Sequence, residues 1–398
     1  MILSSENKDN KITIDNYIRD NDCKINQTRT EYLNGEAIVL QGYRLPRELL
    51  YYNIKNGRFA KEYIKIIRDE GGSLDPEDPD DEKKIQTLLL GLKPNDTRRT
   101  KEDIVKKGQT ELALMTRDGF LIDGNRRMAI LTDLFEETSD EKYNFIKVAR
   151  IEEAISAKDL WAMEAGISLG QDPKSRYGAI NELLKLDEGR KAGFTNKEIA
   201  DKLYGIDDES EIAEKLARLD LMRKYLKQYY DDDEDFTPIE GYNEHFIDLR
   251  DILVNAKRNN KLIDEVDACL KVGFRLIHDQ VPHMRIRTIN QAIKNDYSLT
   301  KITEAADKME EVTTITIDPT LEEEPSTDTV IRFTDFEDEV KAKKNEDKIP
   351  LILNSILNNF AVLRFESDDL KTDVSKGLIK KILDYSKKLN KITENWNE

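Results

Sequence analysis

Strand-like patterns occur almost entirely in the first 155 residues of this 398-residue chain. Residues 36–50 read as a strand that ends in a turn at Pro46, residues 110–123 read as a hairpin, and residues 145–152 alternate apolar and polar side chains. After residue 155 the apolar residues recur at helical spacing. The pattern predicts an α+β N-terminal domain followed by mostly α-helical domains.

The hairpin leads into a second turn that carries two adjacent arginines. The sequence RDG at 117–119 separates its two apolar runs, and DGNRR at 123–127 joins the second run to a helix expected over 125–137. Glycine lets the backbone approach an anion, the free N–H groups of a first helical turn point at it, and arginine matches phosphate oxygens. An ordinary β-turn with two solvated arginines has the same spacing, and both interpretations stay open.

Composition limits the classes of protein that this chain can represent. Hydrophobic residues make up 38% and charged residues 36%, with a net charge of −17, which argues against broad adhesion to nucleic acid. No apolar run reaches the length of a membrane span, and the first residues lack the pattern of a signal peptide. Cys23 and Cys269 are distant in sequence, which favours a reducing, cytoplasmic setting without membrane attachment.

Changes of pattern divide the chain into four parts. They are a polar segment at 1–35, the α+β domain at 36–155, a helical domain at 156–236 and a helical C-terminal region at 237–398 with an acidic linker near 311–334. In the third part, Thr195 and Glu198 form a capping-box pattern at the first of two short helices that resemble a helix-turn-helix. A plain helical hairpin is the alternative interpretation. A basic island at 283–294 is the other candidate for nucleic-acid contact; pairing with the many carboxylates is its alternative.

The strand–DGNRR–helix unit resembles the ParB/sulfiredoxin-like superfamily, whose ParB members carry a Gly-Glu-Arg-Arg box at a strand-to-helix junction. Gly108-Gln109 resembles the Gly-Gln of a preceding ParB box, and the stretch 56–58, Asn-Gly-Arg, resembles the Asn-x-Arg element near the start of such domains. The order of the helices from Trp161 to about residue 230 is similar to the way a ParB domain runs into its helix-turn-helix. The resemblance covers roughly 36–230.

This resemblance implies a nucleotide-binding protein in a DNA-linked process such as partition, DNA modification or phage defence. It implies CTP or ATP as ligand, with Mg²⁺, and it implies binding residues in the turn and in the Asn-Gly-Arg element. These residues are Gly124, Asn125, Arg126, Arg127 and Arg58.

The sequence departs from the ParB pattern at two carboxylate positions. Asn125 stands where the box has glutamate, and Glu164 is followed by Ala165 where ParB has a Glu-Asn pair that helps to hold a metal. Gln171 or Asp172 could compensate, so Glu164 and Asp172 are the candidate metal ligands. Asp123 and Glu164 are the candidate catalytic carboxylates; a capping role in the turn is the alternative for Asp123.

Two other classes of function remain open at this point. One is an enzyme of the same fold, an NTPase, phosphotransferase or nuclease that uses a carboxylate near the phosphate. The other is a helical protein–protein interaction module without nucleotide, in which Arg126 and Arg127 pair with acidic side chains. Protein partners or self-association through the C-terminal helices fit either alternative, and so does binding of DNA.

Overall fold

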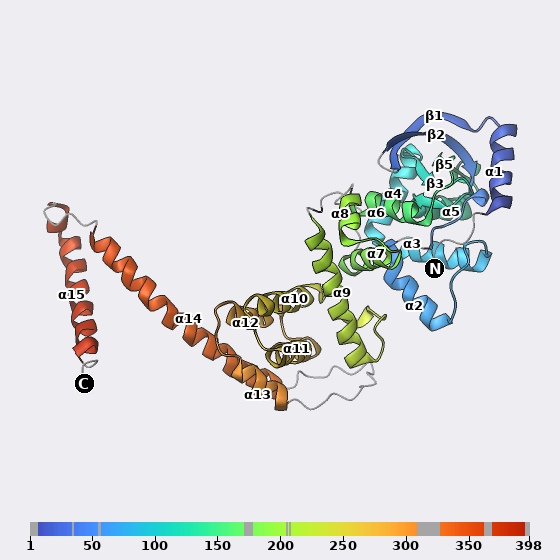
Figure 1. Ribbon diagram of the computed structural model, residues 1–398. Helices are drawn as coiled ribbons and strands as arrows, with labels where there is room; N and C mark the ends of the chain where they lie inside the picture. Colours follow the sequence, from blue (N-terminus) through green and yellow to red (C-terminus); the bar gives the residue numbers. More distant parts are fainter. Residues whose placement is uncertain are drawn as a thin grey trace. The chain divides into compact units, whose positions relative to one another are not determined.

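The computed structural model describes residues 7–33, 36–54, 57–170, 178–203, 206, 208–308, 327–361 and 368–394 (Figure 1). The chain divides into two compact units, Met1–Phe333 and Thr334–Glu398. The predicted fold class is confirmed in outline, because one mixed sheet near the N-terminus is followed by helices. None of the helices that these residues form is long and apolar enough to span a bilayer.

The first unit contains a five-stranded sheet. Its strands are β1 (Lys24–Leu33), β2 (Glu36–Pro46), β3 (Ala113–Met115), β4 (Leu121–Asp123) and β5 (Phe145–Arg150). The spatial order is β1-β2-β5-β3-β4, with β3 parallel to β5 and the other neighbours antiparallel. The hairpin expected over 110–123 is confirmed as β3 and β4, and the strand expected over 145–152 is confirmed as β5.

The segment 1–35, expected only to be polar, contributes the strand β1 and the helix α1 (Lys8–Asp20). Two features hold α1 in place: Ile14 is fully buried, and the Asn10 amide donates to the carbonyl oxygens of Leu49 and Asp118. The partners are 39 and 108 residues away from Asn10, so they have no local sequence signature. Long-range contacts therefore order a segment that has a weak pattern of its own.

Helices cover both faces of the sheet (Figure 1). Their bounds are α2 (Ala60–Glu70), α3 (Pro79–Gly91), α4 (Pro94–Lys107), α5 (Asn125–Thr138) and α6 (Ala157–Gly170). Apolar residues of α3, α4 and α5 share one core with Ile146 and Val148 of β5, while α6 shares another with Ala149 and Ile151. This division follows from the strand period of two, which sends successive side chains to opposite faces.

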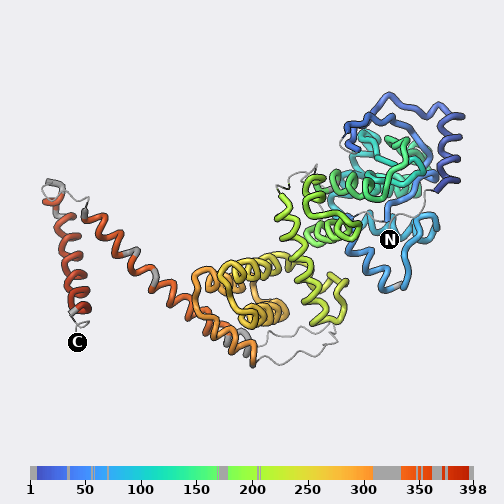
Figure 2. The backbone as a smooth tube through the Cα atoms, viewed as in Figure 1, coloured from blue at the N-terminus to red at the C-terminus, as the bar shows by residue number. Residues whose placement is uncertain are grey.

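The next helices are α7 (Ala179–Lys191), α8 (Asn196–Lys202) and α9 (Glu209–Tyr230) (Figure 2). Trp161 of α6 belongs to their core and lies 4.8 Å from Phe194, centroid to centroid. Gly189 makes this packing possible, because a Cβ atom there would lie 2.4 Å from the Trp161 ring. The capping box predicted at Thr195 and Glu198 is confirmed at the start of α8.

The acidic run 231–236, DDDEDF, is a charge run of the kind that indicates a linker, but it is fastened to the rest of the first unit. Arg68 pairs with Asp232 at 2.9 Å and with Asp235 at 2.7 Å, and Phe236 is fully buried. These contacts correct the linker interpretation: the acidic residues are ion-paired on the folded surface, and the aromatic residue anchors the turn in the core.

More helices follow in the first unit, namely α10 (Asn243–Arg258), α11 (Ile263–His278), α12 (His283–Lys294) and α13 (Thr300–Lys308). The single-turn helices are η1 (Arg47–Leu49), η2 (Gly57–Phe59), η3 (Glu141–Tyr143), η4 (Thr237–Ile239) and η5 (Asp368–Lys371). The last long helices are α14 (Thr327–Ala361) and α15 (Asp373–Glu394). Of the acidic linker expected near 311–334, residues 311–326 lie outside the described residues, and residues 327–334 are helical in α14.

Asp187 of α7 gives the first unit a testable dependence on pH. Its side chain is 2% exposed and lies 2.8 Å from Arg223 and 3.0 Å from Lys191. Burial alone would raise the pKa of Asp187, but these cations outweigh burial and hold the pKa below its ordinary value. The ionised carboxylate therefore stabilises the fold above about pH 4, and this contribution is lost as the pH falls through the lowered pKa.

We expect Asp187→Asn to lower the free energy of unfolding at pH 7 and to flatten its decline below about pH 4. Denaturant titrations at a series of pH values measure both effects. Asp231→Asn is the control, because Asp231 is exposed and pairs with the exposed Lys227. An unchanged acid slope in Asp187→Asn would contradict the role of this carboxylate.

Candidate functional site

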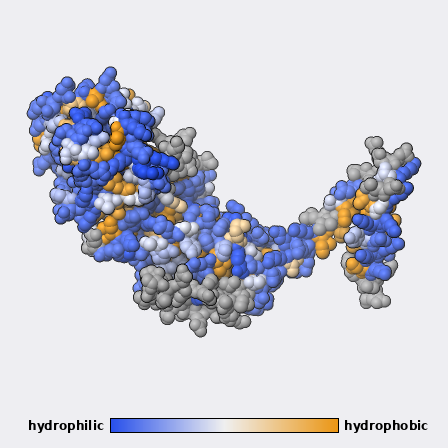
Figure 3. Space-filling model, turned by 180° about the vertical axis from the view of Figure 1, so that it is seen from behind, coloured by the Kyte–Doolittle hydropathy of each residue, from blue (hydrophilic) through white to orange (hydrophobic). Residues whose placement is uncertain are grey.

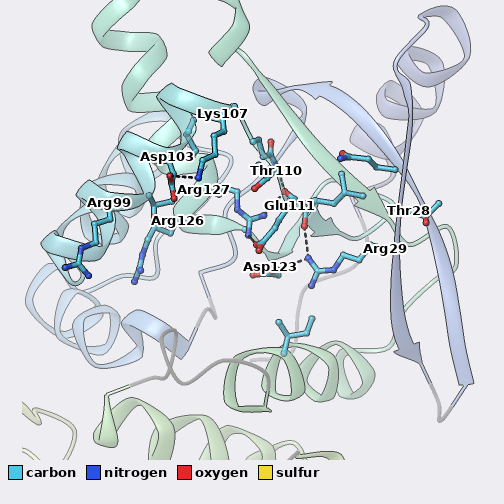
Figure 4. A pocket seen from close by; sticks show the side chains of 18 of the residues that line it. Thr28, Arg29, Arg99, Asp103, Lys107, Thr110, Glu111, Asp123, Arg126 and Arg127 are labelled. Carbon is cyan, nitrogen blue, oxygen red and sulfur yellow. Dashed lines mark hydrogen bonds and ion pairs between the residues drawn. The ribbon is translucent and has the colours of Figure 1, made fainter.

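A cavity of about 1250 Å³ lies against the turn that joins β4 to α5. Its lining comes from β1, from α4 and the loop that follows it, and from the turn itself (Figure 4). Four residues of the 123–127 turn, all except Asn125, belong to this lining. The anion turn predicted from the sequence thus borders a space large enough for a small ligand.

Gly124 shapes the turn. Its φ is +98°, a conformation that side chains other than glycine rarely adopt, and it is the residue just before α5. A Cβ atom at Gly124 would lie 2.5 Å from the Cβ of Ala113 on β3. The first helical bond runs from the Met128 N–H to the Gly124 carbonyl, so the N–H groups before Met128 have no acceptor within the helix.

Arginines from two helices line the cavity. Arg126 and Arg127 come from the first turn of α5, and Arg99 comes from the middle of α4. Figure 4 shows Arg99 and Arg126 pointing in the same direction. Arg127 donates to the carbonyl and to the carboxylate of Glu111, both at 3.0 Å, and the Glu111 side chain is 79% exposed. Because the Glu111 carboxylate is largely in solvent, its pairing contributes little, and an incoming anion can compete for Arg127.

The other end of the cavity is held by an ion-pair network. Arg29 of β1 pairs with Asp123 at 2.8 Å and with Glu31 at 2.6 Å, and it donates to the Leu112 carbonyl at 2.8 Å. Burial alone would lower the pKa of Arg29, but Asp123 and Glu31 outweigh burial and raise it. The network joins the two outer strands of the sheet, β1 and β4. Asp123 is therefore paired with Arg29, and no side chain caps the N-terminus of α5.

Asn125 faces the interior of the fold and lies outside the cavity lining. It is 2% exposed, its Oδ1 accepts from the Asn53 N–H at 2.8 Å, and its Nδ2 donates to the Leu121 carbonyl at 3.1 Å. The amide thus ties the turn to the loop after β2. An amide can both donate and accept in this place, whereas an ionised carboxylate could only accept.

Gly108 and Gln109 belong to the cavity lining and also fasten β5. The Gln109 amide donates to the Lys147 carbonyl at 2.7 Å and accepts from the Lys147 N–H at 2.7 Å. These two bonds resemble the backbone bonds between neighbouring β-strands. They leave only part of the Gln109 side chain to line the cavity. The Gly-Gln pair and the 123–127 turn thus line the same cavity.

Glu164 lies outside the cavity lining. Its side chain is 4% exposed, Oε2 lies 2.5 Å from Lys185 Nζ, and Oε1 accepts from the Gly57 N–H at 3.1 Å. Arg58 follows Gly57 in η2, but its side chain lies outside what the structure describes. Gln171 and Asp172 also lie outside the described residues. The two candidate catalytic carboxylates therefore do not meet at one site, because Asp123 lines the cavity and Glu164 does not.

The described carboxylates do not fit a Mg²⁺ site of the implied kind. Both oxygens of Glu164 are occupied by an ammonium and a backbone N–H, and Asp123 is paired with Arg29. Among the described residues there is no group of three or more His, Cys, Asp or Glu arranged to hold a metal ion.

Three basic side chains of the cavity were not identified from the sequence. Arg29 comes from the segment expected only to be polar, while Arg99 and Lys107 come from a helix whose neighbours could not be predicted. Lys107 pairs with Asp103 at 3.1 Å, and both side chains are largely exposed. A charge run such as Arg98-Arg99 is the only available signal, and it does not say which arginine faces the turn.

Some basic side chains of the two predicted nucleic-acid elements are paired with carboxylates. On α9, Lys215 pairs with Glu182 and Glu211 at 2.7 and 2.8 Å. On α12, His283 and Arg287 both contact Asp248, at 2.9 and 2.8 Å. The helix pair α8–α9 forms, as predicted.

The sequence matches no protein-family model, and no curated protein or solved structure is significantly similar to it.

Proposed function

We propose that this chain is a ParB-like nucleotide-binding protein whose cavity at the DGNRR turn holds the phosphates of CTP or ATP. The proposal is carried by one observation, the convergence of Arg99, Arg126 and Arg127 on a cavity at the first turn of α5. Guanidinium groups and free N–H groups at a helix start are complementary to phosphate oxygens. Gly124 supplies the left-handed backbone that joins β4 to this first turn.

The two ends of the cavity suit different parts of a nucleotide. The arginine end is complementary to a polyphosphate, and the β1 end offers the hydroxyl groups of Thr28 and Thr30 with the apolar side chains of Leu112 and Ile167. The lining carries five acidic and five basic side chains, so its formal charges balance. Selectivity for phosphate therefore depends on the position of the arginines, since total charge does not favour an anion.

The biological setting that we propose is a DNA-linked process such as partition, DNA modification or phage defence. This part rests on the ParB-like order of the turn, the Gly-Gln pair and the helix pair α8–α9. Calorimetric titration of nucleotide with and without duplex DNA tests it. If DNA leaves the affinity for the nucleotide unchanged, the two binding events are not coupled and the DNA-linked part of the proposal is wrong.

We expect the wild-type chain to bind CTP or ATP and Arg126→Ala to weaken that binding at least about tenfold, because a charge-assisted contact to phosphate is lost. Inorganic triphosphate should compete with the nucleotide, since it fills the arginine end alone. Isothermal titration with CTP, ATP, GTP and UTP measures the affinities, and a melting curve shows that the variant is folded.

Two neighbouring arginines on α4 provide a matched control. Arg99 lines the cavity, whereas Arg98 is exposed outside the lining. Arg99→Ala should weaken nucleotide binding several-fold, by roughly 3- to 10-fold, and Arg98→Ala should leave it unchanged. Equal effects of the two substitutions, or no binding of any nucleotide by the wild type below millimolar concentration, would refute the proposed site.

Hydrolysis of the bound nucleotide is a second candidate function, and the position of Asp123 in the cavity lining favours it. Of the two candidate catalytic carboxylates, Asp123 lies in the cavity lining and Glu164 does not. Released phosphate can be measured with wild type and Asp123→Asn in the presence of Mg²⁺ and DNA. Hydrolysis that persists in Asp123→Asn would exclude this residue as the base.

A further inference from the structure

The last two helices expose apolar side chains to an extent that the first unit does not. Eleven of the nineteen large hydrophobic side chains that are exposed in the described residues lie between Ile349 and Ile392. Every described side chain from Lys376 to Thr393 of α15 is exposed. Figure 3 shows hydrophobic surface along this part of the molecule. Exposed apolar area of this size is characteristic of a binding surface.

The apolar residues of α15 are spaced as in a coiled-coil seam. Leu378, Ile382, Tyr385, Leu389 and Ile392 follow one another at intervals of four, three, four and three residues. This spacing places them in one stripe along the helix, as the a and d positions of a heptad do. A helix of 22 residues with no packed face is only marginally stable in water. The seam therefore requires a partner helix.

The end of α14 carries a second stripe of the same kind. Ile349, Leu353, Ile356 and Phe360 repeat the four-three-four spacing, and no charged residue occurs from 349 to 363. On α15, Ile379 and Leu383 widen the apolar arc beyond a two-stranded seam. A wider arc contacts two neighbouring helices, as in a four-helix bundle.

The charges beside the α15 seam select the kind of partner and its direction. Lys381 and Lys388 flank one side of the seam, and Ser386 and Thr393 flank the other. In a parallel pair of identical helices, each lysine faces a hydroxyl side chain of the partner, whereas an antiparallel pair brings lysine against lysine. Identical helices in parallel thus match both their apolar stripes and their flanks.

We propose that this chain dimerises through α15, with two copies of α15 in parallel and the apolar stripe of α14 completing a four-helix bundle. The partner is a second copy of the chain, because the seam is self-complementary in a two-fold arrangement. The interface is independent of the nucleotide site, so either proposal can fail without the other.

Sedimentation analysis of the full chain tests the dimer. We expect the wild type to be a dimer at micromolar concentration and the double variant Ile382→Asp/Leu389→Asp to raise the dissociation constant at least about 100-fold. Lys380→Asp/Lys387→Asp, on the opposite face of α15, is the matched control and should remain dimeric. A monomeric wild type, or a seam variant that dimerises like the wild type, would overturn the proposal.

An introduced cysteine tests the parallel direction. In a parallel pair Ile392→Cys meets its own copy and forms an intermolecular disulfide under mild oxidation, while an antiparallel pair places it near Leu378. Lys387→Cys should not cross-link efficiently, and the native Cys23 and Cys269 are buried. A wild type that stays monomeric but cosediments with anionic lipid vesicles would show that the basic, amphipathic α15 binds a membrane surface, and the dimer would be wrong.

Discussion

Lys185→Met should lower the free energy of unfolding by roughly 3–5 kcal/mol, the largest effect that we expect from a single substitution in this chain. The Lys185 side chain is 1% exposed, and its Nζ lies 2.5 Å from Glu164 and 2.8 Å from Glu188. Burial alone would lower the pKa of Lys185, but the two carboxylates outweigh burial and raise it, so the ammonium is charged. Methionine fills a similar volume but leaves the Glu164 carboxylate buried without its cation.

Urea or guanidinium titration measures this change, and two further variants test its cause. Lys191→Met, on the same helix but 64% exposed, should cost less than about 1 kcal/mol. The double variant Lys185→Met/Glu164→Gln should be more stable than the sum of the single effects predicts, because it removes both charges together. Strictly additive effects would mean that the pair is not the source of the instability.

Gly124→Ala should cost about 2–4 kcal/mol of stability and weaken nucleotide binding. An alanine at this position would have an unfavourable backbone conformation at φ +98°. Its Cβ atom would also lie 2.5 Å from the Cβ of Ala113. Relief of this contact moves the turn away from β3, and with it the arginines that follow. The effect on binding therefore accompanies the effect on folding, because the same turn positions Arg126 and Arg127.

Gly193 is the matched control for this substitution. Its φ is +86°, but a Cβ atom there would have no neighbour within 4 Å. Gly193→Ala should therefore cost only the backbone component, about 1 kcal/mol, and leave nucleotide binding unchanged. Thermal and denaturant unfolding together with nucleotide titration separate the two cases. Equal stability losses at both glycines would show that the contact with Ala113 is relieved without cost.

Much of the candidate site is predictable from local sequence. The RDG and DGNRR turns mark the hairpin and the start of α5, and the spacing alone places Gly124, Arg126 and Arg127 on the same turn. The capping box at Thr195 and Glu198 is predictable for the same reason. Each of these features depends on residues within a few positions of one another, where backbone geometry determines which groups can meet.

The remaining parts of the site depend on contacts between distant segments. Arg29 pairs with Asp123, which lies 94 residues further along the chain, and Glu164 is enclosed by Lys185 and Gly57. Asn125 lies in the same turn as Arg126 and Arg127, yet its side chain accepts a hydrogen bond from the Asn53 N–H in the interior. Local pattern cannot assign a residue to the cavity or to the interior when the choice depends on the segment packed against it.

Sequence alone thus establishes local elements of this protein: strands followed by helices, and the glycine turn with its arginines. The tertiary structure assigns roles among chemically similar residues. It places Asp123 in the cavity and Glu164 in a buried ion pair, and it adds Arg99 to the arginines of the turn. The physical reason is that hydrogen bonding along the chain is local, whereas burial and charge pairing depend on which distant segments meet.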